Sequence, residues 1–140
     1  MADIKLKKHV PLLLKIEEGG WGCSSSTLSL SKGKLIYKVM DLQRGQYSEI
    51  ITPSAQQWKD FRTALDDVGV WNWLGEYPNP GVYDGSYWEL KISYADRKLM
   101  SIGDNNYPTA GGAPSGAPEY TRSFRRLIKA VKALIGKRKF

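Results

Sequence analysis

A strict alternation of polar and apolar residues between Tyr87 and Tyr94 constrains the fold of this chain more than any other feature. Successive side chains of a β-strand point to opposite faces, so the apolar residues of such a segment share one face. Here these residues are Trp88, Leu90, Ile92 and Tyr94. The pattern predicts an antiparallel sheet that packs one face on a core and turns the other toward water.

Shorter patterns predict the remaining elements. Further strands are expected at residues 12–18, 27–31, 35–39, 47–51 and 98–102, with Lys32 and Gly33 as the turn of a hairpin. We expect a helix to begin near Thr52 and Pro53, with Thr52 capping it, and to end at Gly69. A second helix is expected from about Pro118 or Thr121 to Ile135, within a basic C-terminal segment at 119–140. The order of elements is strands, helix, two strands, helix, which predicts an α+β fold with both helices on one face of the sheet.

Length and composition favour one domain spanning residues 1–140. A chain of this size buries enough surface to fold without a metal or a disulfide, and 41% of its residues are hydrophobic. Cys23 is the only cysteine, so no internal disulfide can form. The apolar stretch from Val10 to Leu14 is too short for a signal peptide or a membrane span. We therefore expect a cytoplasmic protein that does not enter a membrane.

Few residues of the sequence suit catalysis or metal binding. His9 and Cys23 are the only histidine and cysteine, and no third group near His9 in the sequence would orient such a pair. Zinc needs several such ligands, and the acidic residues lack the spacing of a calcium loop. We expect no cofactor, no metal site and no enzymatic activity. An enzyme that uses paired carboxylates is the alternative.

Aromatic residues gather between positions 71 and 107, and a loop rich in Gly and Pro follows at 103–118. Trp and Tyr dominate the energetics of protein interfaces, and long loops are commonly functional or mobile. We therefore expect a flexible loop and a protein partner, with the contacts made by Trp73, Tyr77, Tyr83, Asn106 and Tyr107. The alternatives are stacking platforms for single-stranded nucleic acid, or a place in the core.

The net charge of +7 lies entirely at the C-terminal end. Residues 1–118 carry 13 basic and 13 acidic side chains, whereas residues 119–140 carry eight basic ones and Glu119 alone. The helix expected here has one apolar face and an opposite face that is basic. The candidate anion-binding residues on that face are Arg122, Arg125, Arg126, Lys129 and Lys132. The second functional hypothesis is thus a nucleic-acid-binding module, and its alternative is an ordinary solvated face.

Two segments carry a resemblance to a known group of proteins: DGSYW at 84–88 and GDNNYP at 103–108. Together with the order of elements, they make the chain similar to small bacterial domains whose layout resembles that of emfourin-type proteins, which inhibit metalloproteases. This resemblance implies a non-catalytic binding domain. The Gly/Pro-rich insert after Pro108 and the basic C-terminal end have no counterpart in that layout.

Overall fold

Seven strands form one sheet in the computed structural model, which describes residues 9–20, 24–81, 85–136 and 138–140. The strands are β1 (Leu13–Gly20), β2 (Ser25–Ser31), β3 (Lys34–Asp41), β4 (Gly45–Ile51), β5 (Glu76–Tyr77), β6 (Ser86–Ser93) and β7 (Lys98–Asp104). They lie in the order β4-β3-β2-β1-β6-β7-β5. Each neighbouring pair is antiparallel except β5 with β7. The α+β fold with an antiparallel sheet is thus confirmed.

The register of the strands gathers the alternating apolar residues on one face of the sheet. Ile16 of β1 lies between Leu28 of β2 and Leu90 of β6, and all three side chains are buried. Leu35 and Tyr37 of β3 are buried on the same face. The hairpin predicted from residues 27–31 and 35–39 is thus confirmed.

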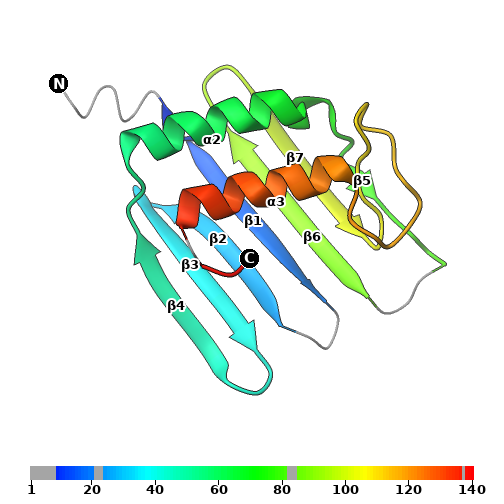
Figure 1. Ribbon diagram of the computed structural model, residues 1–140, viewed down its shortest axis with the longest axis horizontal. Helices are drawn as coiled ribbons and strands as arrows, with labels where there is room; N and C mark the ends of the chain where they lie inside the picture. Colours follow the sequence, from blue (N-terminus) through cyan, green and yellow to red (C-terminus); the bar gives the residue numbers. More distant parts are fainter. Residues whose placement is uncertain (1–8, 21–23, 82–84, 137) are drawn as a thin grey trace.

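Two helices, α2 (Ala55–Val68) and α3 (Arg122–Ile135), cross this apolar face side by side (Figure 1). The side-chain amide of Gln57, early in α2, donates to the carbonyl of Ala133, late in α3, at 3.3 Å. The two helices are therefore antiparallel to each other. The core lies between this helix layer and the sheet, as predicted.

Ser54, and not Thr52, caps the N-terminus of α2, so that part of the prediction was wrong. The Ser54 hydroxyl accepts from the Gln57 amide at 3.1 Å, and the Gln57 side chain accepts from the Ser54 amide at 2.9 Å. This reciprocal pair is a capping box, which satisfies two amides that the helix leaves unbonded. The Ser-x-x-Gln spacing was present in the sequence. Gly69 ends α2 in the left-handed conformation, as expected.

Two short elements follow α2, a 3₁₀ turn η1 (Val70–Asn72) and the two-residue strand β5. Strand β5 adds to the edge of the sheet parallel to β7. A two-residue strand carries no readable alternation, so the sequence did not predict it. No helix in the described part of the chain is long and apolar enough to span a membrane.

Candidate nucleic-acid interface

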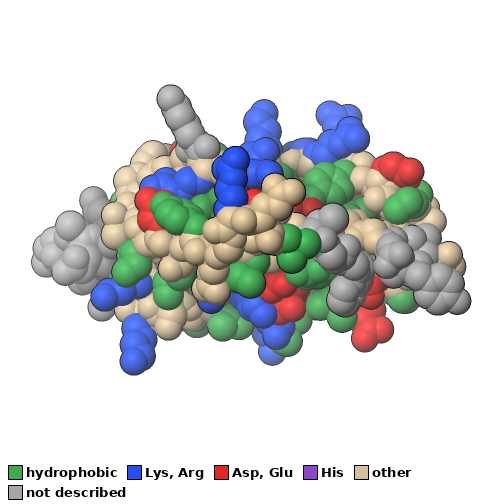
Figure 2. Space-filling model, turned by 90° about the horizontal axis from the view of Figure 1, so that it is seen from below, with side chains coloured by type: hydrophobic (Ala, Val, Ile, Leu, Met, Phe, Trp, Pro, Cys, Tyr) green, Lys and Arg blue, Asp and Glu red, His purple; other side chains and the backbone are tan. Residues whose placement is uncertain are grey.

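Helix α3 turns one side to the core and presents cations on the other. Phe124, Leu127, Val131 and Leu134 are buried against the sheet and α2. All five predicted anion-binding residues are exposed on the opposite side: Arg122, Arg125, Arg126, Lys129 and Lys132. We call these five residues the basic face. Figure 2 shows Lys and Arg side chains projecting from the helix layer along the upper edge of the molecule.

None of the five cations of the basic face forms an ion pair with another described residue. This sets them apart from Arg62 and Arg138, whose guanidinium groups bond to carboxylates at close range. The only acid in the last 22 residues, Glu119, precedes the helix. The basic face therefore keeps its positive field for an external anion.

The basic face is long and narrow. Arg122 and Lys132 are ten positions apart, which corresponds to roughly 15 Å along a helix that rises 1.5 Å per residue. The stripe starts at the N-terminus of α3, where the Thr121 hydroxyl accepts from the Phe124 amide at 3.1 Å. A helix N-terminus carries a partial positive charge, which adds to the field of the first arginines. A line of cations at this spacing suits a polyanion better than a single small anion.

The structure places four of the five predicted partner-binding residues in the interior. Trp73, Tyr77, Asn106 and Tyr107 have exposed fractions of 5%, 0%, 4% and 0%, and Tyr83 lies outside the described residues. Side chains this deeply buried cannot contact a partner directly. Nearby Gly and Pro residues suggested exposed loops, but the apolar rings pack beneath those loops. The alternative interpretation, a place in the core, therefore explains why these aromatic residues cluster in the sequence.

Trp88 is at the centre of these buried rings. Its indole nitrogen donates to the carbonyl of Asn106 at 2.9 Å, and its ring lies 5.1 Å from that of Phe124 and 6.3 Å from that of Tyr107. Tyr77 packs against the same indole at 5.6 Å. Burial raises the pKa of both tyrosine hydroxyls, so they stay neutral at physiological pH. We refer to Trp73, Tyr77, Trp88, Tyr107 and Phe124 as the aromatic cluster.

The aromatic cluster and Asn106 also hold the Gly/Pro-rich loop. The Tyr77 hydroxyl donates to the carbonyl of Gly112 at 2.6 Å, and the Asn106 side chain accepts from the amide of Gly116 at 2.8 Å. Pro108 and Pro114 form an isolated β-bridge. The loop begins after Asp104, where β7 ends, and not at residue 103. These contacts anchor the loop at Gly112, near its middle, and at Gly116, while its mobility stays a prediction.

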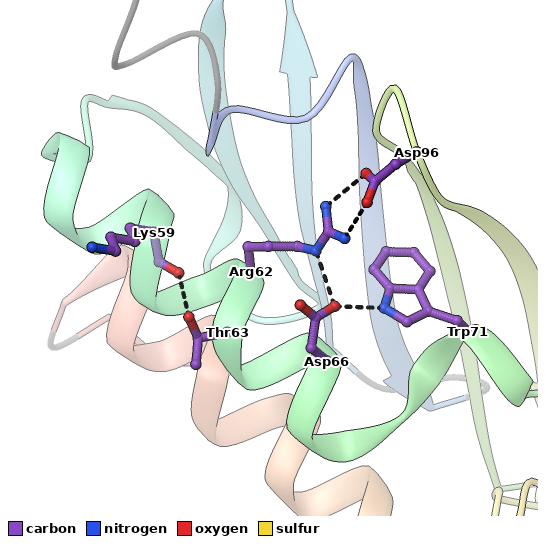
Figure 3. Close-up of polar contacts among 6 residues, drawn as sticks. All are labelled: Lys59, Arg62, Thr63, Asp66, Trp71 and Asp96. Carbon is purple, nitrogen blue, oxygen red and sulfur yellow. Dashed lines mark hydrogen bonds and ion pairs between the residues drawn. The ribbon is translucent and has the colours of Figure 1, made fainter.

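Two ion-pair clusters were not predicted from the sequence. Arg62 donates to both oxygens of Asp96, at 3.0 and 2.8 Å, and to Asp66 at 2.9 Å, and Asp66 also accepts from the Trp71 indole (Figure 3). This cluster ties α2 to η1 and to the turn between β6 and β7. It also shows that Asp66 is not a free carboxylate. The i, i+4 spacing of Arg62 and Asp66 was a readable signal.

The second cluster fixes the C-terminal residues to the sheet. Arg138 donates two hydrogen bonds to Glu49 of β4, and the Tyr37 hydroxyl donates to the carbonyl of Lys139. Hydrogen bonds from Arg138 and Tyr47 lower the pKa of Glu49 to about 2. A cavity of about 630 Å³ lies here, between the C-terminal residues and β2, β3 and β4. Its lining carries three acids, Glu18, Asp41 and Glu49, against three cations, Arg44, Arg138 and Lys139, so the cavity has no excess of positive charge to attract an anion.

Neither the described geometry nor sequence comparison assigns a reaction to this chain. Within the described ranges, no three His, Cys, Asp or Glu side chains come close enough to hold a metal ion, and Cys23 lies outside those ranges. No known protein family matches the sequence, and a search against curated proteins finds no match. The similarity to emfourin-type inhibitors stays a prediction.

Proposed function

We propose that this domain is a non-catalytic module that binds the phosphate backbone of nucleic acid through the basic face of α3. The observation that carries this proposal is that all five cations of the basic face are exposed and unpaired, within the part of the chain that the structure describes. Cations that neutralise phosphates release condensed counterions, and this release supplies most of the free energy of sequence-independent binding.

The chemistry of the basic face favours phosphates. Three of its five residues are arginines, whose planar guanidinium groups bind phosphate oxygens in a bidentate manner. From Arg122 to Lys132 these five cations are the only exposed side chains, because every other side chain in this stretch is buried. A face whose exposed side chains are all cations can contact the phosphate backbone of any sequence, and we therefore expect little sequence preference.

A salt titration of binding tests the proposal. For wild-type protein and generic DNA or RNA, log K should fall with log salt by about 0.7–0.9 for each phosphate neutralised. Replacing Arg122, Arg125, Arg126 and Lys129 by Gln should weaken binding equally across sequences and flatten the slope. Folding should be preserved, because these four side chains are exposed.

A matched control removes four cations from elsewhere. Lys32, Lys34, Arg44 and Arg97 are exposed and lie outside α3, so their replacement by Gln lowers the net charge equally. This control should keep most of the affinity and the salt slope. Equal losses in both variants would show that net charge, rather than the basic face, drives binding. A wild-type Kd weaker than about 0.1 mM near physiological salt would refute the proposal.

Binding of a protein partner is the second candidate, now through the loop itself instead of its tyrosines. The specific observation is that the buried side chains of Tyr77 and Asn106 hold the loop at Gly112 and Gly116, while Ala110, Gly111, Ala113 and Pro114 are exposed. A loop held in this way can present its backbone in one conformation, which lowers the entropy cost of binding. If this candidate is right, binding of the protein partner should survive replacement of the cations of the basic face. It should be lost when the exposed loop residues are replaced.

A further inference from the structure

The face of the sheet opposite the helices has a charge pattern that fits a second copy of itself. We call this surface the open face, because no described helix covers it (Figure 1). In the middle of the sheet, Lys15 of β1 lies beside Lys91 of β6, and in the next row Glu17 lies beside Glu89. Two cations therefore form one row and two anions the adjacent row.

These four side chains already interact within one molecule. Lys15 and Lys91 each approach the same oxygen of Glu89, at 3.4 and 3.3 Å, and Lys15 lies 4.0 Å from Glu17. The side chains of the two lysines are 40% and 37% exposed. The lysines therefore keep access to further acceptors above the sheet.

Apolar and charged residues continue the pattern on β7. Met100 and Ile102 lie next to the two charged rows, opposite Lys91 and Glu89 respectively, and are 63% and 46% exposed. Lys98 and Asp104, both exposed, lie at the two ends of the same strand. Met100 and Ile102 thus add exposed apolar area beside the charged rows, and contact with another surface would remove that area from water.

We propose that the open face pairs with the open face of a second copy in a twofold-symmetric dimer. The axis lies in the interface, perpendicular to the strands, between the row of Lys15 and the row of Glu17. Each strand then packs over the same strand of the other copy, running in the opposite direction. Lys15 faces Glu17 of the second copy, and the three further facing pairs are Lys91 with Glu89, Met100 with Ile102, and Lys98 with Asp104.

Symmetry doubles each of these pairs, as a twofold interface requires. Packed sheets cross at about 30°, so the contacts are closest for the central strands β1 and β6. Six gaps between strands of ~4.8 Å and strands of about seven residues give a face of roughly 700 Å² per copy. Two such faces bury about 1,400 Å² in total, which is within the range of stable interfaces. Because the basic faces of α3 lie on the outside of this dimer, the proposal is independent of nucleic-acid binding.

Sedimentation of two complementary variants of the full chain tests the dimer. In Lys91→Glu, position 91 carries a carboxylate that faces the carboxylate of Glu89 in the second copy. In Glu89→Lys, two ammonium groups face each other across the axis. Each variant alone should sediment as a monomer at concentrations where the wild type is dimeric. An equimolar mixture of the two should restore a dimer, because Glu at 91 then faces Lys at 89 of the other chain.

Two controls separate the interface from folding and from net charge. Lys59→Glu changes the same charge on the exposed side of α2 and should leave the dimer intact. Met100→Lys leaves the central ion pairs in place and should also weaken the dimer, while circular dichroism shows an unchanged fold. The proposal is overturned if the wild type remains monomeric up to a concentration of about 1 mM. It is also overturned if Lys91→Glu dimerises as well as the wild type.

Discussion

Replacement of Gly103 by Ala tests whether the aromatic cluster is structural. Gly103 lies in β7 opposite Trp88, and the space above its α-carbon is filled by the indole ring. An added Cβ would overlap that ring and would lie 2.8 Å from the carbonyl oxygen of Asn106. Because the carbonyl belongs to the backbone and the ring is packed on several sides, neither can move aside easily.

The expected cost follows from the two contacts that the new methyl group disrupts. Overpacking of a core costs about 1–3 kcal/mol, and loss of the hydrogen bond from Trp88 to Asn106 adds about 1 kcal/mol. We therefore expect Gly103→Ala to lower the free energy of unfolding by about 2–4 kcal/mol. That is a large part of the ~5–15 kcal/mol of a typical domain, and corresponds to a drop in Tm of roughly 10 °C.

Denaturant unfolding followed by tryptophan fluorescence gives this free energy directly. Gly111→Ala is the matched control, because no atom lies within 4 Å of the position its Cβ would take. Such a replacement in an open loop should be neutral or stabilise by up to about 1 kcal/mol. A loss below about 1 kcal/mol for Gly103→Ala would show that the cluster is looser than the structure indicates, and would refute the reasoning.

Two further predictions concern the loop and the C-terminal residues. In Tyr77→Phe, the Leu74 amide and the Gly112 carbonyl lose their buried partner, so we expect a loss of about 1–3 kcal/mol and faster proteolysis of the loop. Because the pKa of Glu49 is lowered, its pairing with Arg138 stabilises the fold at pH values above the ordinary carboxyl pKa of 4.5. This stabilisation is lost as the pH falls from 4.5 toward 2 and Glu49 becomes protonated. Thermal melts of wild type and Glu49→Gln should therefore differ at neutral pH and converge near pH 2; a difference that does not depend on pH would contradict the assignment.

The long elements could be predicted from the sequence because their periodicity matches their burial. Residues 87–94 alternate strictly, and β6 indeed buries Trp88, Leu90 and Ile92. Helix α3 has a clear apolar stripe, so its buried and exposed sides followed directly. Local patterns suffice where one face of an element meets the core along its whole length.

The aromatic residues could not be placed in the same way, because their burial depends on contacts between distant segments. Tyr77 belongs to a two-residue strand, and its hydroxyl is bonded to Gly112, 35 positions away. Asn106 is buried because its side chain satisfies the backbone of Pro78 and Gly116. Such residues look like exposed loop residues in the sequence, since Gly, Pro and Asn surround them. Only the tertiary structure shows that they are interior supports.

Nuclear magnetic resonance titration of isotope-labelled protein with a generic DNA duplex tests the central claim most directly. We predict chemical-shift changes at the backbone amides of α3 and at the side-chain signals of Arg122, Arg125 and Arg126, with a Kd that weakens steeply as salt is added. Signals of the open face and of residues 109–117 should stay unchanged. Shift changes concentrated in that loop, or no changes at a duplex concentration of about 0.1 mM and physiological salt, would contradict binding through the basic face.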